Sequence, residues 1–171
     1  PTKLSSLLRM TAIVSLSAAF LLLLMLLLLL FPCCCCCCCM ATITNDLNPD
    51  TDAQYHMKAD EFLTHLSDEG ISADCILLDP PYSPRQITEC YSQAGLTATM
   101  IDTQASFWTN VRNAARLICK PETVVLSFGW NSTGMGSGFE PIEIMLVAHG
   151  GAHNDTIYFA EKMFEKQEVL F

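Results

Sequence analysis

The tetrapeptide Asp79-Pro80-Pro81-Tyr82 combines residue types that could act together on a planar amine. An amine on a heteroaromatic ring is a poor nucleophile because its lone pair is delocalised into the ring. Asp79 and the carbonyl of Pro80 can accept both amine hydrogens, which favours a more tetrahedral nitrogen. Proline fixes the backbone so that this carbonyl points outward, and Tyr82 offers a flat face to a base taken from its stack. The alternative is a proline-rich turn before a helix.

The neighbouring residues predict that the tetrapeptide follows a strand and precedes a helix. Residues 73–78 are mostly apolar without alternation, which is typical of a strand covered on both faces. Ser83 can cap a helix that has Pro84 at its first position and Gln86 in a capping box. Because open α/β sheets bind ligands beyond the carboxyl ends of their strands, we expect a ligand site here.

The rest of the chain from residue 40 onward predicts alternating strands and helices. A short β-branched run predicts a strand at residues 42–44, apolar runs predict strands at 123–128, 143–148 and 156–160, and a further short strand is predicted at 55–57. Apolar residues at helical spacing predict helices over residues 59–66, from Ser83 to about Gly95, and from Asp102 to about Lys120. This alternation predicts a three-layer α/β sheet, and the last two strands predict an antiparallel pair at its edge.

In this context the tetrapeptide resembles the signature of S-adenosylmethionine-dependent amino-methyltransferases of the Asp-Pro-Pro-Tyr type. Residues 41–161 are similar to small phage-type adenine methyltransferases. The resemblance implies a Rossmann-like methyltransferase sheet, S-adenosylmethionine as methyl donor, and a flipped adenine of DNA as the acceptor at N6. It assigns the catalytic role to Asp79, Pro80, Pro81 and Tyr82. RNA and a glutamine side chain of a protein are alternative substrates, because both also present a planar amine.

The resemblance also implies binding roles outside the tetrapeptide. Asp46, at the end of a short strand, would lie near the ribose of the donor, with a turn role as the alternative. Ala59 and Asp60 fall in the segment beside the donor's adenine, although Lys58 stands where the family has an acid. The candidates for the substrate pocket are Ser83, Phe128, Trp130 and Asn131, with a core or lid role as the alternative for the two aromatic residues.

The donor half of the predicted site departs from the family pattern. The strand and glycine turn that would hold the methionine part of the donor should stand before Thr42, where the sequence has cysteines at 33–39. Residues 134–138 do not replace that turn, because Phe139 stands where the pattern G-x-G-x-x-G needs glycine. We therefore expect an incomplete domain with weak or absent activity, and a mobile loop at residues 134–138.

Residues 1–39 differ in composition from residues 40–171, and we treat the two as separate regions. Residues 10–31 carry no charge and are numerous enough to span a bilayer as a helix, which makes a membrane anchor one interpretation. A secretory signal is a second interpretation. A frame-shifted triplet repeat is a third, since the leucine codon CTG and the cysteine codon TGC are one repeat read one base apart. A membrane-anchored interaction protein without catalysis is therefore a competing function.

The charge of the chain and the spacing of its histidines and cysteines bear on whether it binds nucleic acid or metal and on its compartment. Residues 40–171 hold 7 bases against 18 acids, a net charge of −11, which argues against non-specific binding to nucleic acid. Arg112, Arg116 and Lys120 lie at helical spacing and indicate either a solvated helix face or a phosphate contact. The segment 149–155, with two histidines, indicates a hairpin connection, so we predict no metal. Scattered cysteines such as Cys75 favour a reduced, cytoplasmic protein. No oligomeric state is predicted.

Overall fold

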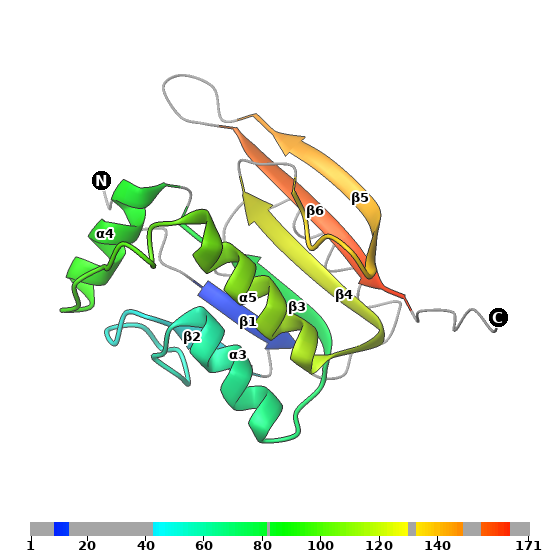
Figure 1. The fold of residues 1–171 in the computed structure, drawn as a ribbon, viewed down its shortest axis with the longest axis horizontal. Coiled ribbons are helices and arrows are strands. Elements are labelled where there is room, and N and C mark those ends of the chain that lie inside the picture. Colours follow the sequence, from blue (N-terminus) through cyan, green and yellow to red (C-terminus); the bar gives the residue numbers. More distant parts are fainter. Residues whose placement is uncertain (1–8, 14–42, 82, 130–132, 149–154, 165–171) are drawn as a thin grey trace.

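The computed structural model describes residues 9–13, 43–81, 83–129, 133–148 and 155–164. Within these residues the sheet has the strand order β2-β1-β3-β4-β6-β5 (Figure 1). The strands are β1 (Arg9–Ile13), β2 (Ile43–Asp46), β3 (Ala73–Asp79), β4 (Cys119–Gly129), β5 (Phe139–Val147) and β6 (Thr156–Met163). The helices are α3 (Ala59–Asp68), α4 (Pro84–Gln93) and α5 (Ala105–Ile118). The predicted α/β content is confirmed.

The central pair of the sheet is parallel and the outer pair is antiparallel. β3 and β4 run parallel, so their carboxyl ends meet at one edge, where Leu78 is the register partner of Ser127. α4 and α5 form the connection between these two strands, as a parallel pair requires. β6 runs antiparallel to both β4 and β5, which confirms the predicted antiparallel pair at the C-terminal end of the fold.

Helices α3 and α5 pack together on one face of the sheet (Figure 1). Their apolar positions recur every three or four residues, so each helix buries one stripe. The main core cluster joins these stripes to the sheet, with Phe62, Leu66, Val111 and Ile118 from the helices and Ile76, Leu78 and Val125 from the strands. A second cluster on the sheet consists of strand residues only, namely Cys75, Leu77, Val124, Leu126, Tyr158 and Ala160. Because no described helix contributes to this cluster, the predicted three-layer arrangement is not confirmed.

Several predicted boundaries are wrong for identifiable reasons. α5 begins at Ala105 rather than at Asp102, because the Asp102 side chain is committed to buried hydrogen bonds before the helix. β4 begins at Cys119, before the apolar run at residues 123–128 from which the strand was predicted. Glu122, just before that run, has a left-handed backbone with φ 72°. The predicted short strand at residues 55–57 is reduced to one parallel bridge between Asn45 and Tyr55.

The N-terminal region contributes a strand, which the sequence did not lead us to expect. β1 lies between β2 and β3 and runs antiparallel to both, so residues 10–13 do not begin a membrane-spanning helix, which was one of three interpretations of residues 10–31. In the described part of the chain, no helix is both long and apolar enough to cross a membrane. The remainder of the predicted anchor and the cysteines at 33–39 lie outside the described residues.

The edge strand β5 is the most exposed of the strands whose burial the structure describes. Its large apolar residues include Ile142, Ile144 and Leu146, which are 55%, 58% and 64% exposed. Two acids, Glu140 and Glu143, are also exposed, and the register shifts between Pro141 and Glu143. β5 is therefore partnered on one side by β6 and carries apolar side chains in solvent.

Candidate functional site

A cleft of about 350 Å³ lies at the carboxyl ends of β3 and β4. Three parts of the chain build most of its wall: the segment after β3, the start of α5 with the residues before it, and the end of β4. The lining residues are Pro80, Pro81, Ser83, Pro84, Ile87, Asp102, Thr103, Gln104, Phe107, Trp108, Thr109, Arg112, Ser127, Phe128, Gly129, Thr133, Gly134 and Phe159. A cleft therefore lies at the carboxyl ends of the strands, where a ligand site was predicted.

The segment from Asp79 to Pro84 is fixed by the strand before it and the helix after it. β3 is buried along most of its length and ends at Asp79, because the two prolines that follow cannot donate to the sheet. Ser83 caps α4, its Oγ accepting the N–H of Gln86 at 3.2 Å, with Pro84 at the first helical position. The predicted cap is confirmed, and it holds the prolines at the cleft.

The structure brings part of the predicted acceptor site together. Pro80, Pro81, Ser83 and Phe128 all line the cleft. Phe128 also packs against Tyr158, with ring centroids 5.3 Å apart, so it contributes to the second core cluster as well. Three further predicted site residues, Tyr82, Trp130 and Asn131, lie outside the described residues.

Asp79 stands where two parts of the predicted site meet. It is half-buried, and it borders a small hollow together with Ala59 at the start of α3, Pro80 and Trp108. Asp46 ends β2 and Asp79 ends β3, and only β1 lies between these two strands. Arg9 of β1 is the register partner of both residues. The two predicted carboxylates therefore lie at the same edge of the sheet.

The predicted donor residues are less open than the acceptor residues. Asp46 is 2% exposed, and its Oδ1 accepts the N–H of Asn48 at 2.9 Å, as in a turn. Ala59 is 0% exposed and belongs to the main core cluster. Asp60 is half-buried, and its Oδ1 accepts the N–H of Glu61 at 3.1 Å. None of these three residues lines the cleft.

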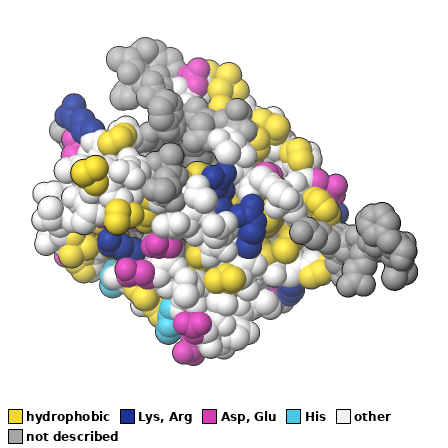
Figure 2. All heavy atoms as spheres, viewed as in Figure 1, with side chains coloured by type: hydrophobic (Ala, Val, Ile, Leu, Met, Phe, Trp, Pro, Cys, Tyr) yellow, Lys and Arg dark blue, Asp and Glu magenta, His cyan; other side chains and the backbone are white. Residues whose placement is uncertain are grey.

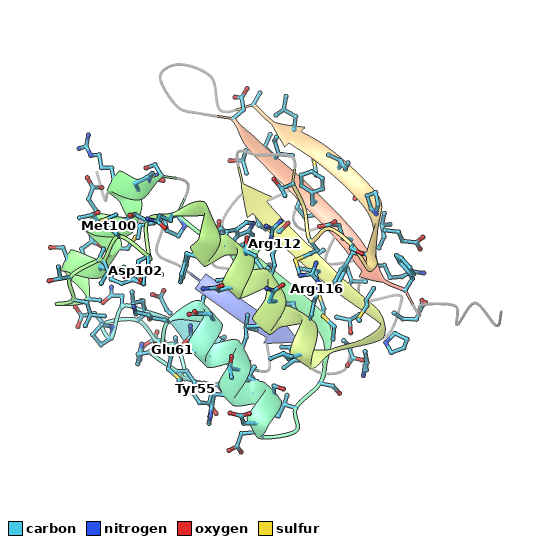
Figure 3. All side chains as sticks on the ribbon, viewed as in Figure 1. Tyr55, Glu61, Met100, Asp102, Arg112 and Arg116 are labelled. Atoms are coloured by element: carbon cyan, nitrogen blue, oxygen red, sulfur yellow. The ribbon has the colours of Figure 1, made fainter. Side chains whose placement is uncertain are left out.

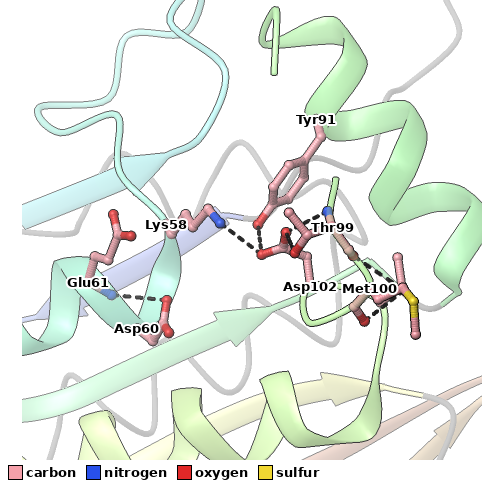
Figure 4. Close-up of polar contacts among 8 residues, drawn as sticks. Lys58, Asp60, Glu61, Tyr91, Thr99, Met100 and Asp102 are labelled. Atoms are coloured by element: carbon pink, nitrogen blue, oxygen red, sulfur yellow. Dashed lines mark hydrogen bonds and ion pairs between the residues drawn. The ribbon is translucent and has the colours of Figure 1, made fainter. Parts of the chain in front are cut away.

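A buried carboxylate network borders the cleft and was not predicted (Figure 4). Asp102 Oδ1 accepts from Lys58 Nζ and from Tyr91 Oη, both at 2.9 Å. Asp102 Oδ2 accepts from the N–H of Thr99 at 2.8 Å and from its hydroxyl at 2.6 Å. The Lys58 ammonium also lies 5.3 Å from the centre of the Tyr91 ring. These contacts, which we call the Asp102 network, tie the start of α3 and the end of α4 to one wall of the cleft.

Burial and hydrogen bonding set the ionisation of this network. Burial by itself would raise the pKa of Asp102, but hydrogen bonds from Thr99, Lys58 and Tyr91 outweigh it and hold that pKa well below the ordinary value. Burial and the bond to Asp102 raise the pKa of Tyr91. Asp102 is therefore a carboxylate and Tyr91 a neutral donor near neutral pH. Lys58, which departs from the family pattern, has a structural partner in Asp102.

The glycine loop, residues 133–138, is fastened to α5 and β6. Arg112 donates to the carbonyl of Gly134 at 3.1 Å, and Arg116 donates to the carbonyl of Met135 (Figure 3). Glu161 of β6 accepts the N–H of Met135 at 2.7 Å. Burial raises the pKa of Glu161, although that N–H and the two arginines oppose the rise. The prediction of a solvated face at Arg112 and Arg116 is therefore wrong, and these contacts argue against the predicted mobile loop.

Lys120, the third residue of the predicted basic stripe, and the scattered cysteines contribute to the fold. Lys120 Nζ lies 2.5 Å from Asp74 Oδ1, which links the start of β4 to β3. Cys75 and Cys90 are buried, as predicted, and burial raises the pKa of the Cys119 thiol to about 12. Within the described ranges, no cluster of three or more His, Cys, Asp or Glu side chains could hold a metal ion.

The cleft has the size of a small-molecule site and aromatic side chains in its wall. Its volume lies within the range of about 300–1,000 Å³ that is common for small-molecule sites. Aromatic side chains in its wall, including Trp108 and Phe159, can contact the face of a ring.

The chain matches no protein-family model, and no curated protein matches it.

Proposed function

We propose that this chain is an amino-methyltransferase of the Asp-Pro-Pro-Tyr type that transfers a methyl group to the N6 amine of adenine in DNA. The observation that carries the proposal is the position of Asp79, Pro80 and Pro81. Asp79 ends a buried parallel strand and borders a small hollow, and Pro80 and Pro81 follow it and line a cleft large enough for a base. The parallel pair β3·β4 is compatible with the Rossmann-like class implied by the tetrapeptide, whereas β1, which runs antiparallel to β2 and β3, departs from a parallel sheet.

In this proposal the chain's own groups orient the amine. The Asp79 carboxylate and the Pro80 carbonyl accept the two N6 hydrogens, so the nitrogen lone pair turns out of the ring plane. S-adenosylmethionine supplies the methyl group when it is bound. The N6 proton leaves to water after transfer, so no side chain with a shifted pKa is needed as general base. The aromatic wall of the cleft holds the ring in place.

The residues proposed to hold S-adenosylmethionine fit it only in part. Asp60 is half-buried at the first turn of α3 and is accessible to a ligand. Asp46 and Ala59 are 2% and 0% exposed, so neither can contact a ribose or an adenine without movement of its neighbours. We therefore propose weak donor binding and slow transfer. Isothermal titration of the full chain with S-adenosylmethionine tests this, and submicromolar binding would contradict it.

The central test is methyl incorporation into adenine-containing DNA by the full chain. We expect Asp79→Asn to lower incorporation by at least about 100-fold, since it replaces a charged, preorganised acceptor with a weaker neutral amide that also carries an NH2 donor. Asp74→Asn is the matched control, because Asp74 lies on the same strand but pairs with Lys120 away from the cleft. Equal incorporation by Asp79→Asn and the unmodified chain, or none by the unmodified chain, would contradict the proposal.

A glutamine side chain of a protein is the second candidate substrate. The net charge of the whole chain is −9, which disfavours a substrate that carries phosphates and is neutral toward a peptide. Parallel incorporation assays with DNA, RNA and a glutamine-containing peptide separate the candidates. Incorporation into the peptide alone would replace DNA with protein as the substrate while leaving the role of Asp79 in place.

A further inference from the structure

Arg112 places a cation in the wall of the cleft. Its side chain is half-buried, and it lines the cleft together with Trp108, which lies one helical turn earlier on α5, about 6 Å along the helix axis. Trp108 also borders the small hollow that contains Asp79 and Pro80. Figure 2 shows Lys and Arg side chains in the middle of the face viewed, and Figure 3 places Arg112 there on α5. A guanidinium therefore lies in the same cleft as the proposed amine-binding residues, displaced from them along α5.

The contacts of Arg112 within the protein leave part of its guanidinium for a ligand. A guanidinium has five N–H donors. Within the described residues Arg112 donates to the carbonyl of Gly134 at 3.1 Å and to the hydroxyl of Thr109 at 3.2 Å, and both acceptors are neutral. Glu161 attracts Arg112 electrostatically, but its carboxylate accepts the N–H of Met135. Arg112 is therefore held in position and retains donors and charge for an anionic group.

The charge that a ligand meets inside the cleft differs from the charge of the whole chain. Among the described residues that line the cleft, Asp102 and Arg112 carry a charge. The Asp102 carboxylate already accepts from Lys58, Tyr91 and Thr99, so its negative charge is compensated within the Asp102 network. The net charge of −9 belongs to the whole chain, and exposed charges are largely screened beyond about 8 Å at physiological salt. The cleft is therefore locally suited to an anion.

We infer that Arg112 binds a phosphate next to the target adenine, so that the cleft holds a nucleotide and not only a base. The inference rests on the proposed function, since it needs the adenine amine at Asp79 and Pro80. In a nucleotide the phosphate is separated from the N6 amine by the ring and the sugar, as Arg112 is displaced from Asp79 along α5. A guanidinium matches phosphate oxygens with paired, charge-assisted hydrogen bonds. A glutamine side chain carries no anion, so this contact favours the nucleotide among the candidate substrates.

The test compares the binding of deoxyadenosine and of its 5′- and 3′-monophosphates to the full chain, by isothermal titration at about 0.15 M salt. The variant is Arg112→Gln, which removes the charge and keeps an amide that can donate to Gly134. Arg116→Gln is the matched control, because Arg116 lies on the same helix and fastens the same loop but does not line the cleft. S-adenosylmethionine is titrated in parallel, because its carboxylate is the other anion that the proposed reaction brings.

At least one monophosphate should bind the unmodified chain about tenfold more tightly than deoxyadenosine, as expected for hydrogen bonds between charged groups. Arg112→Gln should remove this preference, and Arg116→Gln should keep it. The ratio of the two dissociation constants does not depend on the folded fraction of a variant, because both ligands bind the same folded protein.

Equal binding of nucleoside and monophosphates, an unchanged preference in Arg112→Gln, or the same loss in Arg116→Gln would overturn the phosphate contact alone. So would weaker binding of S-adenosylmethionine to Arg112→Gln with an unchanged nucleotide preference, which would assign Arg112 to the carboxylate of the donor. An unmodified chain that binds neither deoxyadenosine nor its monophosphates would overturn the proposed function, and the phosphate contact with it.

Discussion

At the scale of single residues, Asp102 shows how one buried carboxylate can organise a site wall. Its side chain receives donors from three parts of the chain that precede α5: the residue before α3, the helix α4 and the loop residue Thr99. A buried carboxylate needs such donors, because water cannot solvate it. Removing one donor therefore affects the whole arrangement more than a surface substitution would.

We expect Asp102→Asn to lower the free energy of unfolding by about 1–3 kcal/mol at neutral pH, because it weakens hydrogen bonds to a charged acceptor. The folded pKa of Asp102 lies below its unfolded value, so its contribution is present above the unfolded value. That contribution is lost as the pH falls below about 4, through the folded pKa. Urea unfolding of both proteins across this range measures it. A difference that stays constant down to strongly acidic pH would contradict the assignment.

Two residue-scale features could not be read from the sequence. Lys58 and Asp102 are 44 positions apart, and neither local spacing nor helical pattern relates them. Asp102 stood before an apolar helical pattern, so it was assigned to the helix as a first residue. By contrast, Ser83, Pro84 and Gln86 lie within four positions, and their cap is a local interaction that the sequence predicts correctly.

At the scale of elements, the glycine loop depends on contacts from α5 and β6. Gly134 has φ 55°, and a Cβ at this position would lie 2.6 Å from a carboxylate oxygen of Glu161. That carboxylate accepts the N–H of Met135 and is buried, so it has little room to move. The loop conformation therefore requires glycine for two separate reasons.

We expect Gly134→Ala to destabilise the fold by about 1–3 kcal/mol, because it combines backbone strain with displacement of Glu161. Gly138→Ala is the control, since Gly138 also has a positive φ, 91°, but its added Cβ would meet nothing within 4 Å. Thermal unfolding of the two variants compares them. Equal losses would show that the backbone angle alone, and not the contact with Glu161, sets the cost.

The strands and helices themselves were largely predictable, and the reason is burial. Continuous apolar runs in β3 and β4 and the apolar stripes of α3 and α5 are consequences of the two core clusters. The role of Arg112 and Arg116 was not predictable, because helical spacing shows that two cations share a face but not what that face meets. The position of β1 was equally hidden, since its partners lie more than 30 residues away.

At the scale of the whole molecule, charge should govern how the chain meets a nucleic acid. Arg112 and Arg116 are engaged with the glycine loop, and Lys58 and Lys120 with buried or half-buried acids. Few cations in the described residues therefore remain to release counterions from DNA. The affinity should depend on the bases more than on the phosphates.

We accordingly expect binding of single-stranded DNA by the full chain to fall less than about tenfold between 50 and 200 mM salt, against the about 10³- to 10⁵-fold of proteins with many phosphate contacts. Fluorescence anisotropy at several salt concentrations gives the slope. A steep slope would point to a basic surface outside the described residues and would contradict the charge argument.

An exposed edge strand such as β5 can act as a template for pairing between molecules. Its outer backbone groups have no strand partner among the described residues, and Ile142, Ile144 and Leu146 make the strand attractive to the same strand of a neighbouring molecule. The carboxylates of Glu140 and Glu143 and the irregularity after Pro141 oppose such stacking by repulsion and by poor fit. We expect these residues to act as gatekeepers, so that the acidity which disfavours contact with DNA also protects the protein at its own exposed edge.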